Sequence, residues 1–170
     1  MASLMDELLD VLQQEDAEYE GLVALSKQKK QIIIEANIEE LQVLTVREEE
    51  IANRIVNLES KREQVIHDMA IVLNREPEEL TIECMVQILS KQPVEQKRLN
   101  DIRKKLRATL DEMNQINEQN KSLIHQALEM VEFDLTLFRS MRQAPETANY
   151  DRRAENTGDI LANSGFDARQ

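Results

Sequence analysis

The side chains that could do chemistry in this chain are few, and their spacing does not form a site. His67 and His125 are the two histidines, and they fall in different predicted helices with no second His or Cys at metal-ligand spacing. The glutamate run 48–50 places successive carboxylates on different faces of a helix, so it cannot act as a paired acid and base. Cys84 is the one cysteine, and the neighbouring Glu83 carboxylate disfavours its thiolate. There is no glycine-rich phosphate loop. We therefore expect no catalysis, no metal and no cofactor, and a function in binding.

The composition favours long helices and narrows the class of partner. Of the 170 residues 41% are hydrophobic but only 3% are aromatic, and there are three glycines and three prolines, which suits helices better than a sheet. The net charge of −12 repels nucleic-acid phosphates and anionic membrane surfaces. The N-terminus is acidic, unlike a signal peptide, and no apolar run is long enough for membrane insertion. These features lead us to expect a cytoplasmic protein.

Capping signals and apolar periodicity predict three long helices and one short helix. We expect these helices at about residues 3–35, 38–74, 81–91 and 94–142, within a helical domain that spans 1–142. Apolar residues of the second helix, among them Leu44, Ile55, Val65 and Val72, recur at alternating spacings of three and four, which is typical of a coiled coil. The sequence therefore predicts an all-α antiparallel bundle. Residues 143–170 are polar, and we expect them to form a flexible, disordered tail.

Two asparagines interrupt the apolar stripe of the last helix. Asn117 and Asn120 fall where the spacing leads us to expect leucine. If successive long helices are antiparallel, Glu48 of the second helix lies opposite Asn120, and Tyr19 of the first helix lies at the same level. We therefore predict a buried polar layer of these four residues, which would fix the register and lower the stability. The alternative is that the stripe drifts and both asparagines point to solvent.

The end of the last helix is apolar, although this arrangement leaves it without a neighbour. The first two long helices would end opposite about residue 130, so roughly twelve further residues, about 18 Å of helix, would have no partner in the bundle. An exposed apolar helical segment is typical of a surface that binds another helix. The predicted binding residues are Ile124, Leu128, Val131, Phe133, Leu135, Leu137, Phe138 and Met141.

Five segments carry a family resemblance. They are "NIEELQVLTVREEEIANRIVNLESKR" (37–62), "LTIECMVQIL" (80–89), "LDEMNQINEQNKSLIHQALEMVEFDLTLF" (110–138), and "NYDRRAENTG" and "GFDAR" in the tail. Together they resemble the FlgN-type flagellar export chaperones, in the second helix, the short middle helix, the asparagine-containing last helix and the aromatic tail. The "AENTG" after the tyrosine departs from the family pattern, in which the glycine follows sooner.

The resemblance implies a cytoplasmic chaperone of the flagellar type III export system. Such a chaperone binds C-terminal helical segments of the hook-associated proteins that form the hook–filament junction, and delivers them to the export gate. The apolar end of the last helix would then bind the client. The resemblance also implies that a tail tyrosine contributes to gate docking, and Tyr150 and Phe166 are the two aromatic residues of the tail. An isolated ring in a polar segment is typical of a docking motif, although both rings could instead fold back onto the bundle.

A second hypothesis gives the same fold a different function. The apolar end of the last helix could close a permanent homodimer, which would make the chain a constitutive coiled-coil scaffold without a secreted client. Composition alone does not separate these hypotheses. The resemblance favours the chaperone, for which we expect a monomer or a weak homodimer.

Overall fold

The computed structural model describes residues 2–143, and these residues are almost entirely helical. The elements in order are α1 (Ala2–Ile34), α2 (Ile38–Leu73), the 3-10 turn η1 (Pro77–Glu79), α3 (Ile82–Ile88), the 3-10 turn η2 (Leu89–Lys91) and α4 (Pro93–Gln143). The predicted all-α fold is confirmed. None of the described helices is apolar over a length that could cross a membrane. The chain divides into two units, Met1–Glu129 and Met130–Gln170, and each is considered by itself.

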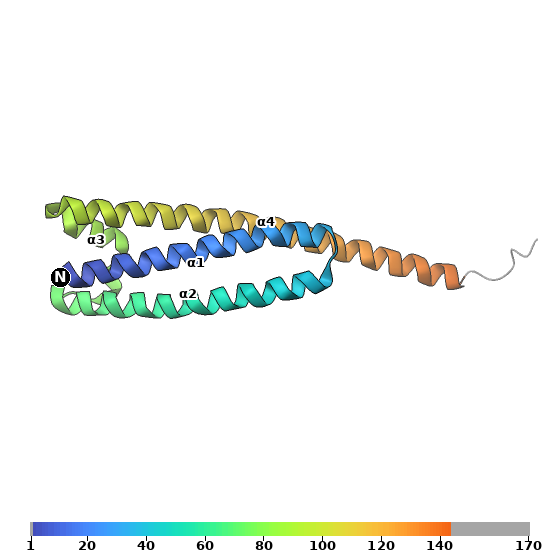
Figure 1. Ribbon diagram of the computed structural model, residues 1–170, viewed down its shortest axis with the longest axis horizontal. Coiled ribbons are helices and arrows are strands. Elements are labelled where there is room, and N and C mark those ends of the chain that lie inside the picture. Colours follow the sequence, from blue (N-terminus) through green and yellow to red (C-terminus); the bar gives the residue numbers. More distant parts are fainter. Residues whose placement is uncertain (1, 144–170) are drawn as a thin grey trace, which may run out of the picture. The chain divides into compact units, whose positions relative to one another are not determined.

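Local signals determine where α1 ends and α2 begins. Ala36 adopts a left-handed conformation with φ 53°. The amides of Ala36 and Asn37 donate to the carbonyls of Ile33 and Ile32, which satisfies acceptors that the last turn of a helix leaves free. The side chain of Asn37 then accepts from the amide of Glu40 at 3.2 Å, and so caps α2. Because this turn is short, α1 and α2 form a close antiparallel hairpin (Figure 1).

The segment between α2 and α4 contains a short helix that ends earlier than predicted. The hydroxyl of Thr81 accepts from the amide of Cys84 at 3.1 Å and caps α3. α3 ends at Ile88, and the three residues after it form η2. Figure 1 shows α3 at the end of the bundle that also holds the start of α1.

The main core lies at this end of the bundle, where α3 packs against all three long helices. Its buried members are Met5, Leu8, Leu9 and Leu12 of α1, Val65, Met69 and Ala70 of α2, Leu80, Met85 and Leu89 of the connecting segment, and Leu99, Ile102 and Leu106 of α4. Burying one large apolar side chain contributes about 1.5–3 kcal/mol. The connecting segment is therefore an integral part of the bundle.

The burial of α1 decreases along its length. The buried residues of its first half are Met5, Leu8, Leu9, Val11, Leu12, Glu15 and Asp16, whereas residues 17–34 have three, namely Val23, Ser26 and Ile33. The first half has three neighbours, because the α3 segment packs there beside α2 and α4. Among the residues that the structure describes, the second half has no counterpart of that third neighbour.

Candidate functional site

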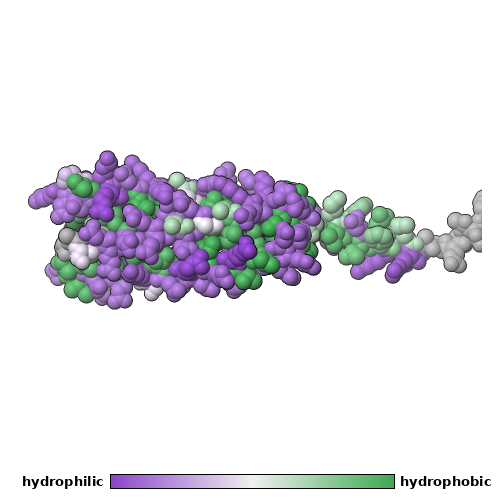
Figure 2. Space-filling view, viewed as in Figure 1, coloured by the Kyte–Doolittle hydropathy of each residue, from purple (hydrophilic) through white to green (hydrophobic). Residues whose placement is uncertain are grey.

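The end of α4 presents exposed apolar side chains. The predicted binding residues of the second unit are between 48% and 68% exposed, namely Val131, Phe133, Leu135, Leu137, Phe138 and Met141. Figure 2 shows apolar side chains gathered over this part of the chain. Of the two predicted members in the first unit, Leu128 is exposed and Ile124 is half-buried. The structure therefore leaves most of the predicted surface accessible.

Helical periodicity arranges these side chains in two stripes. Val131, Leu135 and Phe138 follow one another at spacings of four and three, and therefore lie on one face of α4. Phe133 and Leu137 share a second face, at a spacing of four. Thr136 and Ser140 donate to the carbonyls of Glu132 and Leu137 in the same helix, so those hydroxyls are already satisfied. The segment can therefore contact a partner mainly through apolar side chains.

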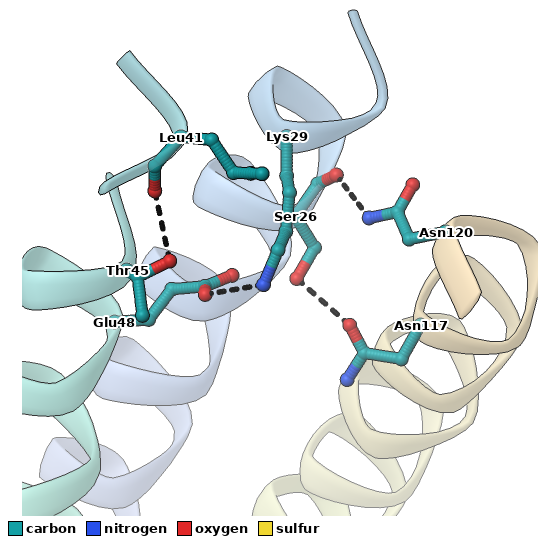
Figure 3. Close-up of polar contacts among 7 residues, drawn as sticks. All are labelled: Ser26, Lys29, Leu41, Thr45, Glu48, Asn117 and Asn120. Atoms are coloured by element: carbon teal, nitrogen blue, oxygen red, sulfur yellow. Dashed lines mark hydrogen bonds and ion pairs between the residues drawn. The ribbon is translucent and has the colours of Figure 1, made fainter. Parts of the chain in front are cut away.

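A groove of about 640 Å³ lies between the three long helices in the first unit. It is lined by Leu22, Ser26 and Lys29 of α1, Thr45, Glu48, Glu49 and Ala52 of α2, and Asn117, Asn120, Lys121 and Ile124 of α4. The predicted polar residues Glu48, Asn117 and Asn120 thus line one groove. Figure 3 shows Glu48 on α2 and the two asparagines on α4, with Ser26 and Lys29 between them on α1.

Ser26 is the residue that ties the two asparagines to α1. The side-chain amide of Asn120 donates to the Ser26 carbonyl at 2.8 Å, and the Ser26 hydroxyl donates to the Asn117 side chain at 3.0 Å (Figure 3). Asn120 is buried, and its side-chain oxygen has no hydrogen-bond partner among the described residues. Asn117 remains exposed, although it keeps its bond to Ser26. No pattern of residue types or spacing singles out Ser26.

The predicted polar layer was wrong in two respects, namely the partner of Glu48 and the position of Tyr19. Glu48 pairs with Lys29 of α1 at 2.7 Å rather than with an asparagine. The Tyr19 hydroxyl donates to Glu59 at 3.3 Å, and its ring packs against the main core. Glu59 lies three turns from Glu48 along α2, about 16 Å at 1.5 Å per residue. Tyr19 therefore lies at the level of Glu59, away from Glu48 and the two asparagines.

Two buried carboxylates of α1 were not predicted. Glu15 accepts from Arg62 of α2 at 3.0 Å, and Asp16 pairs with Lys105 of α4 at 2.7 Å. Burial raises the pKa of Glu15; Arg62 opposes this effect, and the nearby Glu59 carboxylate adds to it. Hydrogen bonds to Asp16 and Glu20 raise the pKa of Lys105. These contacts connect α1 to its two long neighbours through charged groups.

The remaining reactive residue types lie apart from one another. His67 is exposed, and His125 lies 3.3 Å from Glu129 in the next turn of its own helix. Arg75 lies 3.9 Å from the Cys84 sulfur, whereas Glu83 pairs with Arg103 of α4. Within residues 2–143 the His, Cys, Asp and Glu side chains form no group of three that could hold a metal ion. Tyr150 and Phe166, the predicted gate-docking residues, lie outside the described residues.

Comparison with known proteins identifies the family. A family model described as FlgN protein matches residues 1–158. None of the curated proteins and none of the solved structures compared with the chain matches it. The matched region includes all four helices and most of the sequence, and it agrees with the resemblance carried by residues 37–62 and 110–138. The chain therefore belongs to the FlgN family of flagellar type III export chaperones.

Proposed function

We propose that this chain is a cytoplasmic export chaperone that binds C-terminal helical segments of hook–filament junction subunits and delivers them to the export gate. In this proposal residues 1–142 form the helical chaperone domain, and residues 143–170 form a flexible docking tail. Family membership supports the general activity. The observation that supports helical clients is the exposed apolar surface at the end of α4.

The two stripes at the end of α4 suit amphipathic helical partners. Val131, Leu135 and Phe138 form one stripe along the helix, and Phe133 and Leu137 belong to the other. A client helix would bury one stripe through its own apolar residues at matching spacings. A client that wraps around the segment would bury both. Each large side chain that becomes buried would contribute about 1.5–3 kcal/mol to binding.

The tail is proposed to connect the loaded chaperone to the export gate. Tyr150 and Phe166 are the two aromatic residues of the segment, in a polar sequence that is too poor in apolar residues to form its own core. A single ring buries about 150–250 Å², which suits the anchor of a weak, reversible contact. Client binding and gate docking would then use different residues.

The competing function is a constitutive homodimeric scaffold. The same exposed residues, such as Phe133 and Phe138, favour it, because two copies could cover each other's apolar surface. The net charge of −12 opposes close association of two copies and favours a partner that brings positive charge.

Light scattering on the purified chain, alone and after mixing with an intact hook–filament junction subunit of the same organism, separates these functions. The chaperone proposal predicts a monomer or weak dimer that forms a complex with the junction subunit. A stable dimer that persists in high salt and does not bind the junction subunit would establish the scaffold instead.

A further inference from the structure

The positions that line the groove between the long helices correspond to the positions against which α3 packs. The residues of α4 that line the groove each follow a residue at the α3 end of the bundle by about 18 positions, which is five turns of helix. Asn117 corresponds in this way to Leu99, Asn120 to Ile102, Lys121 to Arg103 and Ile124 to Leu106. Residues five turns apart lie on the same face of a helix, so one face of α4 lines both the groove and the site of α3.

Three groove residues of the other two long helices show the same correspondence. In α1, Leu22 and Ser26 of the groove follow Leu4 and Leu8 by five turns. In α2, which runs in the opposite direction, Ala52 precedes Ala70 by five turns. Leu8 and Ala70 belong to the core that α3 completes, and Leu4 packs against that core. The groove is therefore built like the α3 site but lacks a helix within the described residues.

The residue types of the two places differ in one respect. The core positions of Leu8, Leu99 and Ile102 are apolar. The corresponding positions in the groove are Ser26 of α1, which hydrogen-bonds to both asparagines, and Asn117 and Asn120 of α4. A groove lined by hydrogen-bonded polar groups can face water without a large penalty, whereas an apolar one cannot. These three polar positions lower the cost of leaving the groove open to water, although most of its surface is apolar, and so suit an occupant that enters and leaves.

Unpaired groups of the groove indicate what the occupant carries. Arg103 of α4 pairs with Glu83 of α3 at 3.4 Å, and Lys121, five turns further along, has no ion pair among the described residues. The exposed Glu49 on the α2 side likewise has no ion pair there. The buried side-chain oxygen of Asn120 finds no donor within residues 2–143. A helix with a carboxylate for Lys121, a cation for Glu49 and an N–H or O–H donor for Asn120 would complement all three.

We propose that this groove binds an amphipathic helix of the secreted client, in the place that α3 occupies at the other end of the bundle. This inference rests on the proposed chaperone function and adds a second client-binding surface to the exposed end of α4. Leu22, Ala52 and Ile124 supply the apolar contacts, and Lys121 and Glu49 orient the bound helix. A second copy of the chain is disfavoured as the occupant, because the net charge of −12 repels it.

Two substitutions block the groove without entering the main core. Ala52→Trp places a large ring in the groove from an exposed position of α2, and Lys121→Glu reverses the charge on α4. Ala108→Trp and Lys104→Glu are the matched controls, since both residues are exposed on α4 and lie outside the groove. Binding of the intact hook–filament junction subunit is measured by calorimetry, and circular dichroism checks that each variant is folded.

The proposal predicts that Ala52→Trp and Lys121→Glu each weaken binding at least tenfold, while both controls stay within twofold of wild type. Full affinity in folded Lys121→Glu and Ala52→Trp would overturn it even if wild type binds the junction subunit. If Ala52→Trp does not fold, Lys121→Glu alone decides, because its side chain is exposed. If wild type is a dimer and both variants are monomers, the occupant is a second copy of the chain, and the proposal is overturned. Failure of wild type to bind the subunit would instead contradict the chaperone proposal itself, and the inference with it.

Discussion

Glu15 and Asp16 are adjacent in α1, and their buried carboxylates bind different helices. Glu15 accepts from Arg62 of α2, and Asp16 pairs with Lys105 of α4. The Thr109 hydroxyl lies 2.9 Å from Asp16 and adds a second contact to α4. Charged groups in the middle of the bundle thus specify how α1 meets both neighbours, at positions where apolar residues would hold the helices less selectively.

Glu15 gives the stability of the bundle a defined pH dependence. Its pKa is raised above the ordinary 4.5 because it is buried, so the folded state binds its proton more tightly than the unfolded state does. The stability that comes from this group is therefore present below pH 4.5 and is lost as the pH rises through the raised value. Wild type should gain unfolding free energy relative to Glu15→Gln as the pH falls from 7 toward 4.5.

Urea unfolding of wild type and Glu15→Gln at several pH values measures this difference. Comparing the two proteins cancels the titration of the other carboxylates. Glu7→Gln, at an exposed position of the same helix, is the matched control for the substitution itself. A difference between wild type and Glu15→Gln that does not change with pH, or that changes in the opposite direction, would show that the Arg62 contact outweighs burial.

Asn120→Leu should stabilise the bundle. The substitution removes a buried oxygen that has no partner among the described residues, and an unsatisfied buried polar group costs about 1–3 kcal/mol. For a chain of this size the melting temperature should rise by about 2–4 °C per kcal/mol. Thermal unfolding followed by circular dichroism measures the change, and Asn117→Leu is the control because Asn117 is exposed. A lower melting temperature for Asn120→Leu would show that its bond to Ser26 matters more than the unpaired oxygen.

Apolar periodicity was sufficient to predict the helices, because the spacing of buried residues determines which face of each helix packs. In α2 the predicted positions Leu44, Ile55 and Val65 are buried. The pattern was wrong at Val72, which is exposed, while Ala70 is buried. A straight helix drifts by about 20° per heptad relative to a strict seven-residue repeat, so the buried face moves away from the predicted positions near the end of a long helix.

The register between helices was the part that the sequence did not determine. A displacement by about one turn keeps every apolar stripe facing its neighbour, so periodicity cannot detect it, and Tyr19 was assigned to the wrong level for this reason. Glu15 and Asp16 could have been found, since they lie three and four positions after Leu12, which is the spacing of a buried face. The correspondence between the groove and the α3 site required the structure.

Tyr150→Ala should separate gate docking from client binding. Tyr150 lies outside residues 1–142, the proposed chaperone domain, so its loss should leave the affinity for the junction subunit unchanged while reducing binding to the export gate. A pull-down with the cytoplasmic part of the gate and a secretion assay for the client measure the two effects. Phe166→Ala tests whether the second ring contributes. Loss of client binding in Tyr150→Ala, or no change in either activity, would remove the tail from the proposal.

The central claim is that the exposed apolar end of α4 binds the client. Calorimetry with a C-terminal peptide of a hook–filament junction subunit tests it through the double variant Leu135→Ala, Phe138→Ala. Losing two large buried contacts should weaken binding by about 3 kcal/mol or more, which is over a hundredfold. The melting temperature should hardly change, because both side chains are at least half exposed. The control Val46→Ala, Val56→Ala removes exposed apolar side chains from α2 and should keep full affinity. Unchanged affinity in the folded Leu135→Ala, Phe138→Ala variant would contradict the claim.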